Sequence, residues 1–292
     1  MFYGVKIGIY QEILWRCGNF EQQLRKAAAC GFGVVDFSDF KAYDFPLFAL
    51  SPALYETTLR QYALIASDCG VEISQVHAPG GPVAAELTTE DRAKRLSFTC
   101  RAIEGAAMLG CPRLVMHPFY PYATRDLSHA EETRDINVEL LRKVCDKGRE
   151  CGVVICLENT PSLRYSLATA RDVAELVREI NDPQLRVCLD TGHCAYFEMQ
   201  PAKAVRQIGG ELLEALHIHD NNGREDQHRL PYDGIIDWTD FARALGEAGF
   251  GGVLTLELRK KTQLPEALFD DYLRHAYRRA AYIAALVQTE KH

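Results

Sequence analysis

The sequence lacks the features of several protein classes. No stretch reaches the roughly 18 apolar residues that a membrane helix needs, and the first segment, MFYGVKIGIYQEILW, has neither a long apolar core nor a small-residue cleavage site. The ten cysteines include no CxxC pair. In a chain of 292 residues this pattern is typical of buried thiols in a reducing compartment. We therefore expect a cytoplasmic protein without a membrane segment.

An excess of positive charge is also missing. Lys and Arg total 33 against 40 Asp and Glu, which gives a net charge of −7, and the charges are scattered along the chain. Such a chain offers no continuous electrostatic track for phosphate backbones, so we expect no nucleic-acid partner. The apolar content of 47% is sufficient for a sizeable core.

What the chain does contain is a repeated unit. A helical, Ala- and Arg-rich stretch ends in Gly and is followed by a short β-branched run, as in LRKAAACGFGVVDFS, GAAMLGCPRLVMHP and KGRECGVVICLEN. Each Gly suits a helix C-terminus, where positive φ is cheap for Gly alone. Gly31, Gly70, Gly110 and Gly152 lie 39, 40 and 42 residues apart, which is about the length of one βα unit.

The repeat predicts eight strands that alternate with eight helices. This order favours a closed (β/α)8 TIM barrel in a single domain over residues 1–292. A doubly wound open sheet competes with it, but no GxGxxG follows the first strand and no domain linker is evident. The predicted strands are 5–10, 33–38, 72–77, 113–117, 153–158, 186–190, 214–219 and 252–258. The predicted helices lie near 19–30, 53–68, 91–109, 129–150, 169–180, 201–209, 239–248 and 265–287.

Acidic and histidine side chains gather at the ends of these strands, where TIM barrels build their active sites. A single buried residue of this kind is commonly paired with a partner in the core. Burying several of them near one axis would cost roughly several kcal/mol per unpaired charge, and Arg259 is the only basic residue at the same strand ends. A bound divalent cation would compensate the carboxylates. The positions are Asp36, His77, His117, Glu158, Asp190, His193, His217, His219 and Glu257.

The residues predicted to bind this metal are Glu158, Asp190, His217 and Glu257. Three carboxylates and one imidazole suit Mn²⁺, Mg²⁺, Co²⁺ or Zn²⁺. His217 and His219 lie two residues apart on one face of a strand, so spacing alone does not decide which is the ligand and which lies beside it.

Several phrases resemble the xylose isomerase-like TIM barrel superfamily, that of sugar phosphate isomerases and epimerases. They are LENT, LDTGH, LTLEL, and HIHDNNG followed by DQH. The superfamily includes ketose 3-epimerases, inosose isomerases and dehydratases, hydroxypyruvate isomerases and the zinc-dependent abasic-site endonucleases of the endonuclease IV type. The resemblance implies that Glu158, Asp190, His217 and Glu257 bind one metal and that His219 is a pocket residue.

The resemblance also covers the ligands that the endonucleases add to bind three zinc ions. His77, His117, His193 and the pair Asp226 and His228 fall where these would be, so the chain could hold an additional metal through Asp226 and His228. In the epimerases, the position of His193 contacts substrate. DNA repair is disfavoured because VHAPGGP has two glycines where the endonucleases carry bulky residues, and because the chain is acidic.

We predict a metal-dependent isomerase or epimerase of a ketose, inosose or related polyol. It would work through a metal-stabilised enediolate. Glu158 and Glu257 come from roughly opposite sides of the barrel, so one can remove a proton and the other return it. The loop after the seventh strand either closes over the ligand or is a solvated polar loop. Predicted substrate contacts are His77, His117, His193, His219 and Arg224; candidate stacking residues are Tyr10, Trp15, Phe119, Tyr196 and Trp238.

Three alternatives belong to other classes. The same enediolate could expel a β-leaving group, which would make the protein a lyase or dehydratase of a related keto-sugar or inosose. An endonuclease IV-like phosphodiesterase and a non-catalytic carbohydrate-binding subunit are disfavoured, the second because the full ligand set is present. Association into a homo-oligomer is left open, as are the sugar and the metal.

Overall fold

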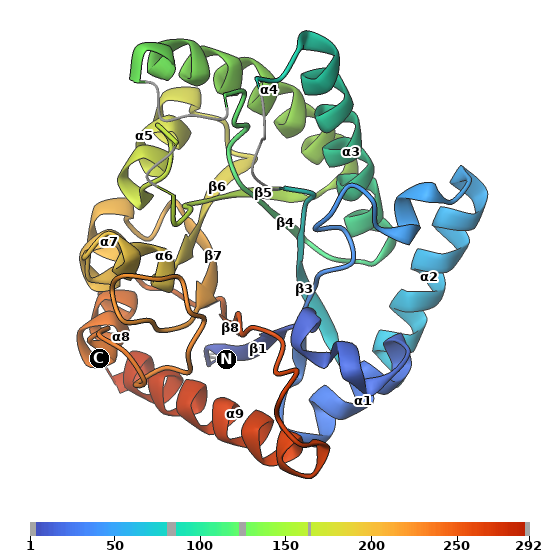
Figure 1. Ribbon diagram of the computed structural model, residues 1–292, viewed down its shortest axis with the longest axis vertical. Helices are drawn as coiled ribbons and strands as arrows, with labels where there is room; N and C mark the ends of the chain where they lie inside the picture. Colours follow the sequence, from blue (N-terminus) through green and yellow to red (C-terminus); the bar gives the residue numbers. More distant parts are fainter. Residues whose placement is uncertain (1–3, 81–85, 123–126, 163–164, 290–292) are drawn as a thin grey trace.

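The computed structural model describes residues 4–80, 86–122, 127–162 and 165–289, and it confirms the closed parallel barrel (Figure 1). Gly81, the second glycine of VHAPGGP, lies outside the described residues. The strands pair in sequence order, and β1 closes the barrel on β8. They are β1 Lys6–Tyr10, β2 Val34–Phe37, β3 Glu72–His77, β4 Arg113–Met116, β5 Val154–Glu158, β6 Leu185–Asp190, β7 Leu213–Ile218 and β8 Val253–Leu256.

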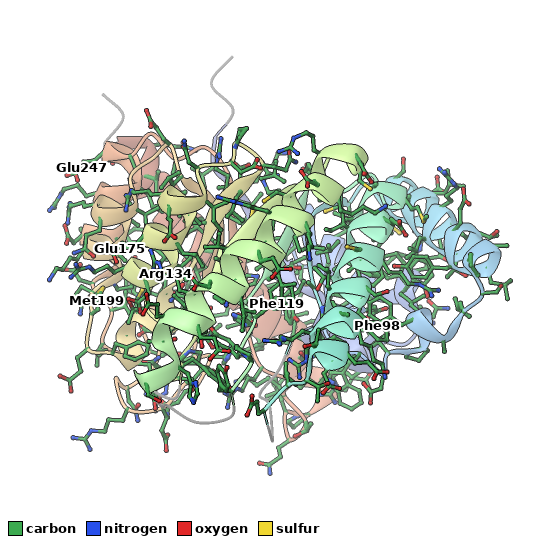
Figure 2. All side chains as sticks on the ribbon, turned by 90° about the horizontal axis from the view of Figure 1, so that it is seen from above. Phe98, Phe119, Arg134, Glu175, Met199 and Glu247 are labelled. Carbon is green, nitrogen blue, oxygen red and sulfur yellow. The ribbon has the colours of Figure 1, made fainter. Side chains whose placement is uncertain are left out.

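The eight predicted helices are present around the barrel. Charged side chains cover their outer faces, as at Arg134 of α4 and Glu175 of α5 (Figure 2). Their apolar faces pack on the strands, as periodic amphipathic helices do. The helices are α1 Phe20–Ala29, α2 Pro52–Asp68, α3 Thr89–Met108, α4 Ala130–Cys151, α5 Ala170–Ile180, α7 Pro201–Ile208, α8 Trp238–Glu247 and α9 Glu266–Thr289.

The repeated glycines have the predicted conformation. Gly31, Gly70, Gly110 and Gly152 all have positive φ, between 65° and 104°, directly after a helix or one residue later. At Gly152, the C-cap of α4, the backbone N–H donates to carbonyls of the last helical turn. These glycines end each helix and turn the chain into the next strand.

Short helices at the strand ends were not predicted from the sequence. They are three 3-10 segments, Gln11–Cys17, Pro46–Ala49 and Leu127–His129, and the six-residue helix α6 Thr191–Tyr196. Helix α6 begins directly after β6, where the Asp190 side chain accepts the backbone N–H of His193 at 2.7 Å. A helix this short has too few residues for a periodic pattern.

Small side chains fill the interior of the barrel below its carboxyl ends. Val115, Cys156, Cys188 and Ala215, from β4 to β7, form a separate buried cluster. The larger core lies between the strands and the surrounding helices. The carboxyl ends of the strands therefore rest on a packed floor. None of the helices in the described ranges is long and apolar enough to cross a membrane.

Candidate metal centre and active site

The four predicted metal ligands converge at the carboxyl end of the barrel. Glu158 is the last residue of β5, Asp190 is the last of β6, His217 lies in β7, and Glu257 directly follows β8. One ligand atom from each lies within 4.8 Å of the others. The sequence analysis placed Glu257 inside a strand, 252–258, but the observed β8 ends one residue before it. Its N–H still donates to Ile218 O of β7 at 3.2 Å. Strand pairing thus fixes its position.

The two ring nitrogens of His217 have different surroundings. Nδ1 lies 2.6 Å from Glu158 Oε1 and 3.5 Å from Glu257 Oε2, so it faces the ligand carboxylates. Nε2 lies 2.7 Å from Asp36 Oδ2. A carboxylate that accepts Nε2–H holds the tautomer in which Nδ1 is the metal-binding atom.

Asp36 is held in turn by a side chain that the sequence analysis missed. Gln75 of β3 donates from Nε2 to Asp36 Oδ2 at 2.8 Å, and both residues are buried. Burial raises the pKa of Asp36, while its hydrogen bond and charge interaction with His217 lower it, and the net direction is upward. Asp36 is thus a positioning residue for His217.

Charge inside the cluster fits a divalent cation. Burial alone would raise the pKa of Glu158, but His217 and His117 bring it well below its usual range. Burial would lower the pKa of His217, but Glu158 and Glu257 bring it well above its usual range. Protonated His217 supplies the positive charge that the carboxylates require, and a divalent cation would replace that proton. Glu257 Oε2 is buried without a hydrogen-bond partner among the described residues, as an open ligand atom would be.

A second group of possible ligands lies beside the first. Ligand atoms of His193, His219, Asp226 and His228 are within 4.8 Å of one another. His219 Nε2 lies 3.1 Å from Asp190 Oδ2, and its ring stacks on that of His228 with centroids 3.9 Å apart. His219 Nδ1 and Asp226 Oδ1 are buried with no hydrogen-bond partner in the described part of the chain. The structure thus separates the two histidines, with His217 of β7 in the first group and His219, directly after β7, in the second.

Asp226 and His228 form an ion pair over this group. His228 Nε2 lies 2.9 Å from Asp226 Oδ2. Burial would raise the pKa of Asp226, but the hydrogen bond from His228 and the charge of His193 lower it to about 2. Burial would lower the pKa of His228, but the Glu257 charge and the hydrogen bond to Asp226 raise it to about 9. Arg259 also contacts Asp226, with Nη2 3.1 Å from Oδ2.

Two further predicted residues lie against Glu158. His77 Nε2 is 3.2 Å and His117 Nε2 is 3.6 Å from Glu158 Oε2. Burial lowers the pKa of His117 to about 4, so this ring is neutral at physiological pH. The three residues form another candidate metal group. Cys188 also approaches Glu158 and His217, but burial holds its pKa well above the usual value, so it is a neutral thiol.

The loop after β7 brings two of its three predicted residues into the site and leaves the third outside. Asp220 anchors the loop: it pairs with Arg229 in an antiparallel bridge and accepts the Trp238 indole N–H at 2.8 Å. Asp226 and His228 reach the site from this loop. Arg224 is exposed, with its backbone N–H donating to Asn222, and its side chain has no contact with the two groups among the described residues. Its predicted role in substrate binding stays a prediction.

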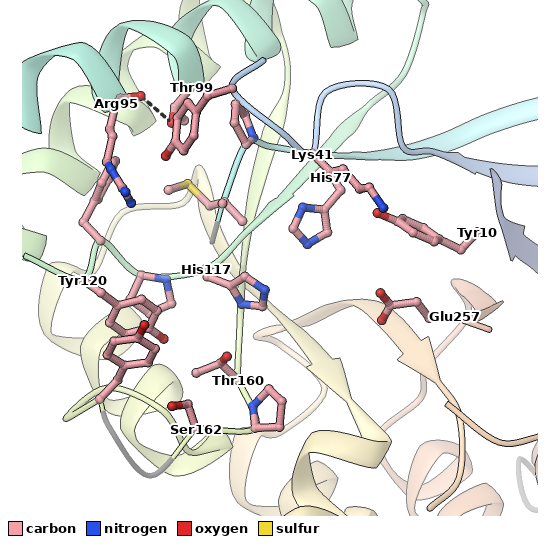
Figure 3. A pocket seen from close by; sticks show the side chains of 18 of the residues that line it. Tyr10, Lys41, His77, Arg95, Thr99, His117, Tyr120, Thr160, Ser162 and Glu257 are labelled. Atoms are coloured by element: carbon pink, nitrogen blue, oxygen red, sulfur yellow. Dashed lines mark hydrogen bonds between the residues drawn. The ribbon is translucent and has the colours of Figure 1, made fainter. Parts of the chain in front are cut away.

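A cavity of about 520 Å³ opens next to the metal ligands (Figure 3). Glu257, His77 and His117 line it, whereas Glu158, with 1% of its side chain exposed, lies underneath. Of the candidate stacking residues, Tyr10 and Phe119 line the cavity; Trp238 is core and Trp15 is exposed.

Several cavity residues were missed from the sequence, among them three with a charged or aromatic side chain. Lys41 and Tyr43 follow β2 in a loop, and Arg95 lies on α3. Charged and aromatic residues are common on exposed loops and helix surfaces, so no sequence signal distinguished Lys41, Tyr43 and Arg95 from their neighbours.

Comparison with known proteins agrees with this geometry. The model of the xylose isomerase-like TIM barrel family matches residues 24–279. An uncharacterized protein of Methanocaldococcus jannaschii is 31% identical over 187 residues, which cover 62% of this chain and 63% of that protein. D-psicose 3-epimerase of Ruminiclostridium cellulolyticum is 23% identical over 261 residues, which cover 87% of this chain and 83% of the epimerase.

Solved structures show the same barrel. A crystal structure of D-psicose 3-epimerase in the presence of D-fructose superposes with a TM-score of 0.78 at 20% identity, over 96% of this chain and 99% of that one. The structure of the IOLI protein with a binding zinc atom gives a TM-score of 0.77 at 18% identity, over 98% and 99% of the two chains. At these identities the likeness establishes the fold.

Proposed function

Because this chain belongs to the xylose isomerase-like TIM barrel family, we propose that it is a divalent-metal-dependent sugar isomerase or epimerase. Its substrate is a ketose, an inosose or a related polyol ketone. The observation that carries the proposal is the convergence of Glu158, Asp190, His217 and Glu257 beside a cavity that Glu257 lines. The relative that acts on D-psicose and the zinc-binding structural neighbour support the same assignment.

The metal ligands are Glu158, Asp190, His217 through Nδ1, and Glu257. A bound Mn²⁺, Mg²⁺, Co²⁺ or Zn²⁺ would act there as a Lewis acid on a substrate carbonyl. Asp36 orients His217 from behind. The packed floor excludes water from the lower side of the site.

Proton transfer is assigned to Glu257 and Glu158. Glu257 has 16% of its side chain exposed and lines the cavity, so it can reach a substrate C–H directly. Glu158 is covered and accepts hydrogen bonds from His217 and His77, so the geometry supports Glu257 more directly. His193 and His219, from the adjoining group, are proposed to hold substrate hydroxyls.

The second group extends the proposal to an additional metal at Asp226 and His228. His219 Nδ1 and Asp226 Oδ1, which lack hydrogen-bond partners among the described residues, favour it. The ion pair between His228 Nε2 and Asp226 Oδ2 compensates the charge of both groups without a metal and would have to open. Metal content distinguishes the two arrangements: about one ion per chain for the first group alone, and two or more if the second group also binds.

A lyase or dehydratase is the alternative that the same geometry supports. Removal of the same proton by Glu257 leads to elimination if a β-leaving group is present. Loss of the leaving group can be seen in the same samples as proton exchange, so one experiment separates the two reactions.

The test is exchange of solvent deuterium into ketoses and inososes, followed by proton NMR. Native protein should exchange an α-hydrogen of its substrate, and a chelator should stop the exchange. Glu257→Gln should lower the rate by about 100-fold or more, because it removes the acid/base group. Glu211→Gln, at an exposed position outside the cavity, is the matched control and should keep the native rate.

Two outcomes contradict the assignment. Undiminished exchange in Glu257→Gln would remove Glu257 from proton transfer. A protein that binds sugar but is indifferent both to chelator and to Glu158→Gln would be a non-catalytic carbohydrate-binding subunit.

A further inference from the structure

One charged side chain of the cavity has no partner of opposite charge among the described residues. Glu12 pairs with Lys41 on one oxygen and with Lys260 on the other. Glu257 faces the metal ligands. Arg95 also lines the cavity, yet its guanidinium makes no ion pair with any Asp or Glu of the described residues. The cavity thus holds an uncompensated positive charge at Arg95.

The guanidinium of Arg95 is held in place by an aromatic stack. Its central carbon lies 5.1 Å from the centroid of the Tyr43 ring. Tyr43 packs edge to face on Phe98 of α3, with centroids 5.4 Å apart. A guanidinium that lies over an aromatic ring is restrained in position, and its five N–H donors can bind a planar or tetrahedral anion. Arg95 is thereby pre-organised for a ligand in the cavity.

Arg95 lies across the cavity from the metal ligands. Figure 3 shows it near Tyr120, on the side opposite Tyr10 and Glu257. Thr99 and Ser162 also line the cavity, and the Thr99 hydroxyl donates to the Arg95 carbonyl at 3.1 Å. A molecule that is bound at Glu257 and extends across the cavity would meet Arg95 at its far end.

We infer that the substrate carries an anionic group, a carboxylate or a phosphate, at the end remote from the carbon that exchanges its proton, and that Arg95 binds this group. The inference rests on the proposed function, because that function places the ketone end at Glu257. Carboxylate and phosphate both match the paired N–H donors of a guanidinium. A neutral sugar would leave the charge of Arg95 uncompensated.

Calorimetric binding to the metal-loaded protein tests this with three probes that differ at one end: D-fructose, D-fructuronate and D-fructose 6-phosphate. We expect at least one anionic probe to bind about tenfold or more tightly than fructose. The stronger of the two identifies the source of the charge. Arg95→Gln should abolish the difference, and Arg95→Lys should retain part of it.

Arg92→Gln is the control, because Arg92 lies one turn earlier on α3 and contacts Thr89 rather than the cavity. It should keep the full preference for the anion. If Arg95→Gln does not fold, the native preference should still shrink as ionic strength rises. The inference is overturned if no anionic probe binds more tightly than fructose, or if Arg95→Gln keeps the preference. Binding and deuterium exchange are separate measurements, so failure of the proposed function is distinguishable.

Discussion

Single atoms decide what each residue of the centre can do. His217 has one ring nitrogen toward Glu158 and the other toward Asp36, at 2.6 and 2.7 Å. A free imidazole would exchange its two tautomers, whereas Asp36 stabilises the one with a proton on Nε2. The buried Asp36 would therefore act on a bound metal through His217, although it is not itself a predicted ligand.

Asp36→Asn should weaken metal binding by about 10- to 100-fold, because a neutral amide is a poorer acceptor for Nε2–H. Competition with a chromophoric chelator measures the affinity directly. Asp135→Asn, at an exposed position of α4, makes the same chemical change away from the centre and should have no effect. Equal affinities in Asp36→Asn and native protein would show that Asp36 does not orient the ligand.

The sequence predicted the positions of single residues better than their partners. Glu158, Asp190 and His217 were recognisable because polar residues at the ends of buried strands are unusual. The contact between Asp36 and His217 joins β2 and β7, which are not neighbours in the barrel, so no pairing rule brings them together. Arg95 differs from other helix-surface arginines in that it lines the cavity, which its position in the sequence does not indicate.

At the scale of elements, helix α6 brings backbone unusually close to the site. Gly192 lies in its first turn, and a Cβ built on it would stand 1.9 Å from Cε1 of His219. The amide of Asn221 donates to Gly192 O at 2.7 Å, which fixes this turn against the loop after β7. Any side chain at this position would displace the His219 ring.

Gly192→Ala should lower the free energy of unfolding by about 1 to 3 kcal/mol, because the added methyl group overpacks a buried contact. Urea denaturation gives the value. Gly33→Ala is the matched control, since its Cβ would meet nothing within 4 Å and its φ is not in the left-handed region. It should change the stability by no more than ~1 kcal/mol. A Gly192→Ala variant as stable as the control would mean that His219 has room to move.

Elements were predictable where their pattern repeats. The eight long helices and eight strands follow from hydrophobic periodicity and from the glycines that end the helices. Helix α6 follows from its cap at Asp190, and the sequences of α6 and of the 3-10 segments are too short to show a period. The prediction therefore described the eight strands and eight helices of the barrel and left out the short helical segments that connect them.

For the whole molecule, stability should depend on the ionisation of Asp39. Burial raises the pKa of this carboxyl from 3.8 to about 6, and a hydrogen bond from Gln11 opposes the shift only in part. Folding then favours the protonated form. The resulting stability is fully present below about pH 4 and is lost as the pH rises through about 6.

Relative to Asp39→Asn, the native protein should lose on the order of 2 kcal/mol of unfolding free energy between these two pH values. Urea denaturation of both proteins at each pH measures the difference, and the other carboxylates cancel because both proteins contain them. If the difference in unfolding free energy between the two proteins does not change with pH, the pKa of Asp39 is not raised in the folded protein.

The packed floor of Val115, Cys156, Cys188 and Ala215 has a consequence for the order of events. The metal ligands lie between this floor and the cavity, so an ion cannot arrive from below. Under the proposed function, a sugar that fills the cavity would block the route by which the ion came. The metal would then bind before the sugar and dissociate after it, so a saturating sugar should slow metal loss.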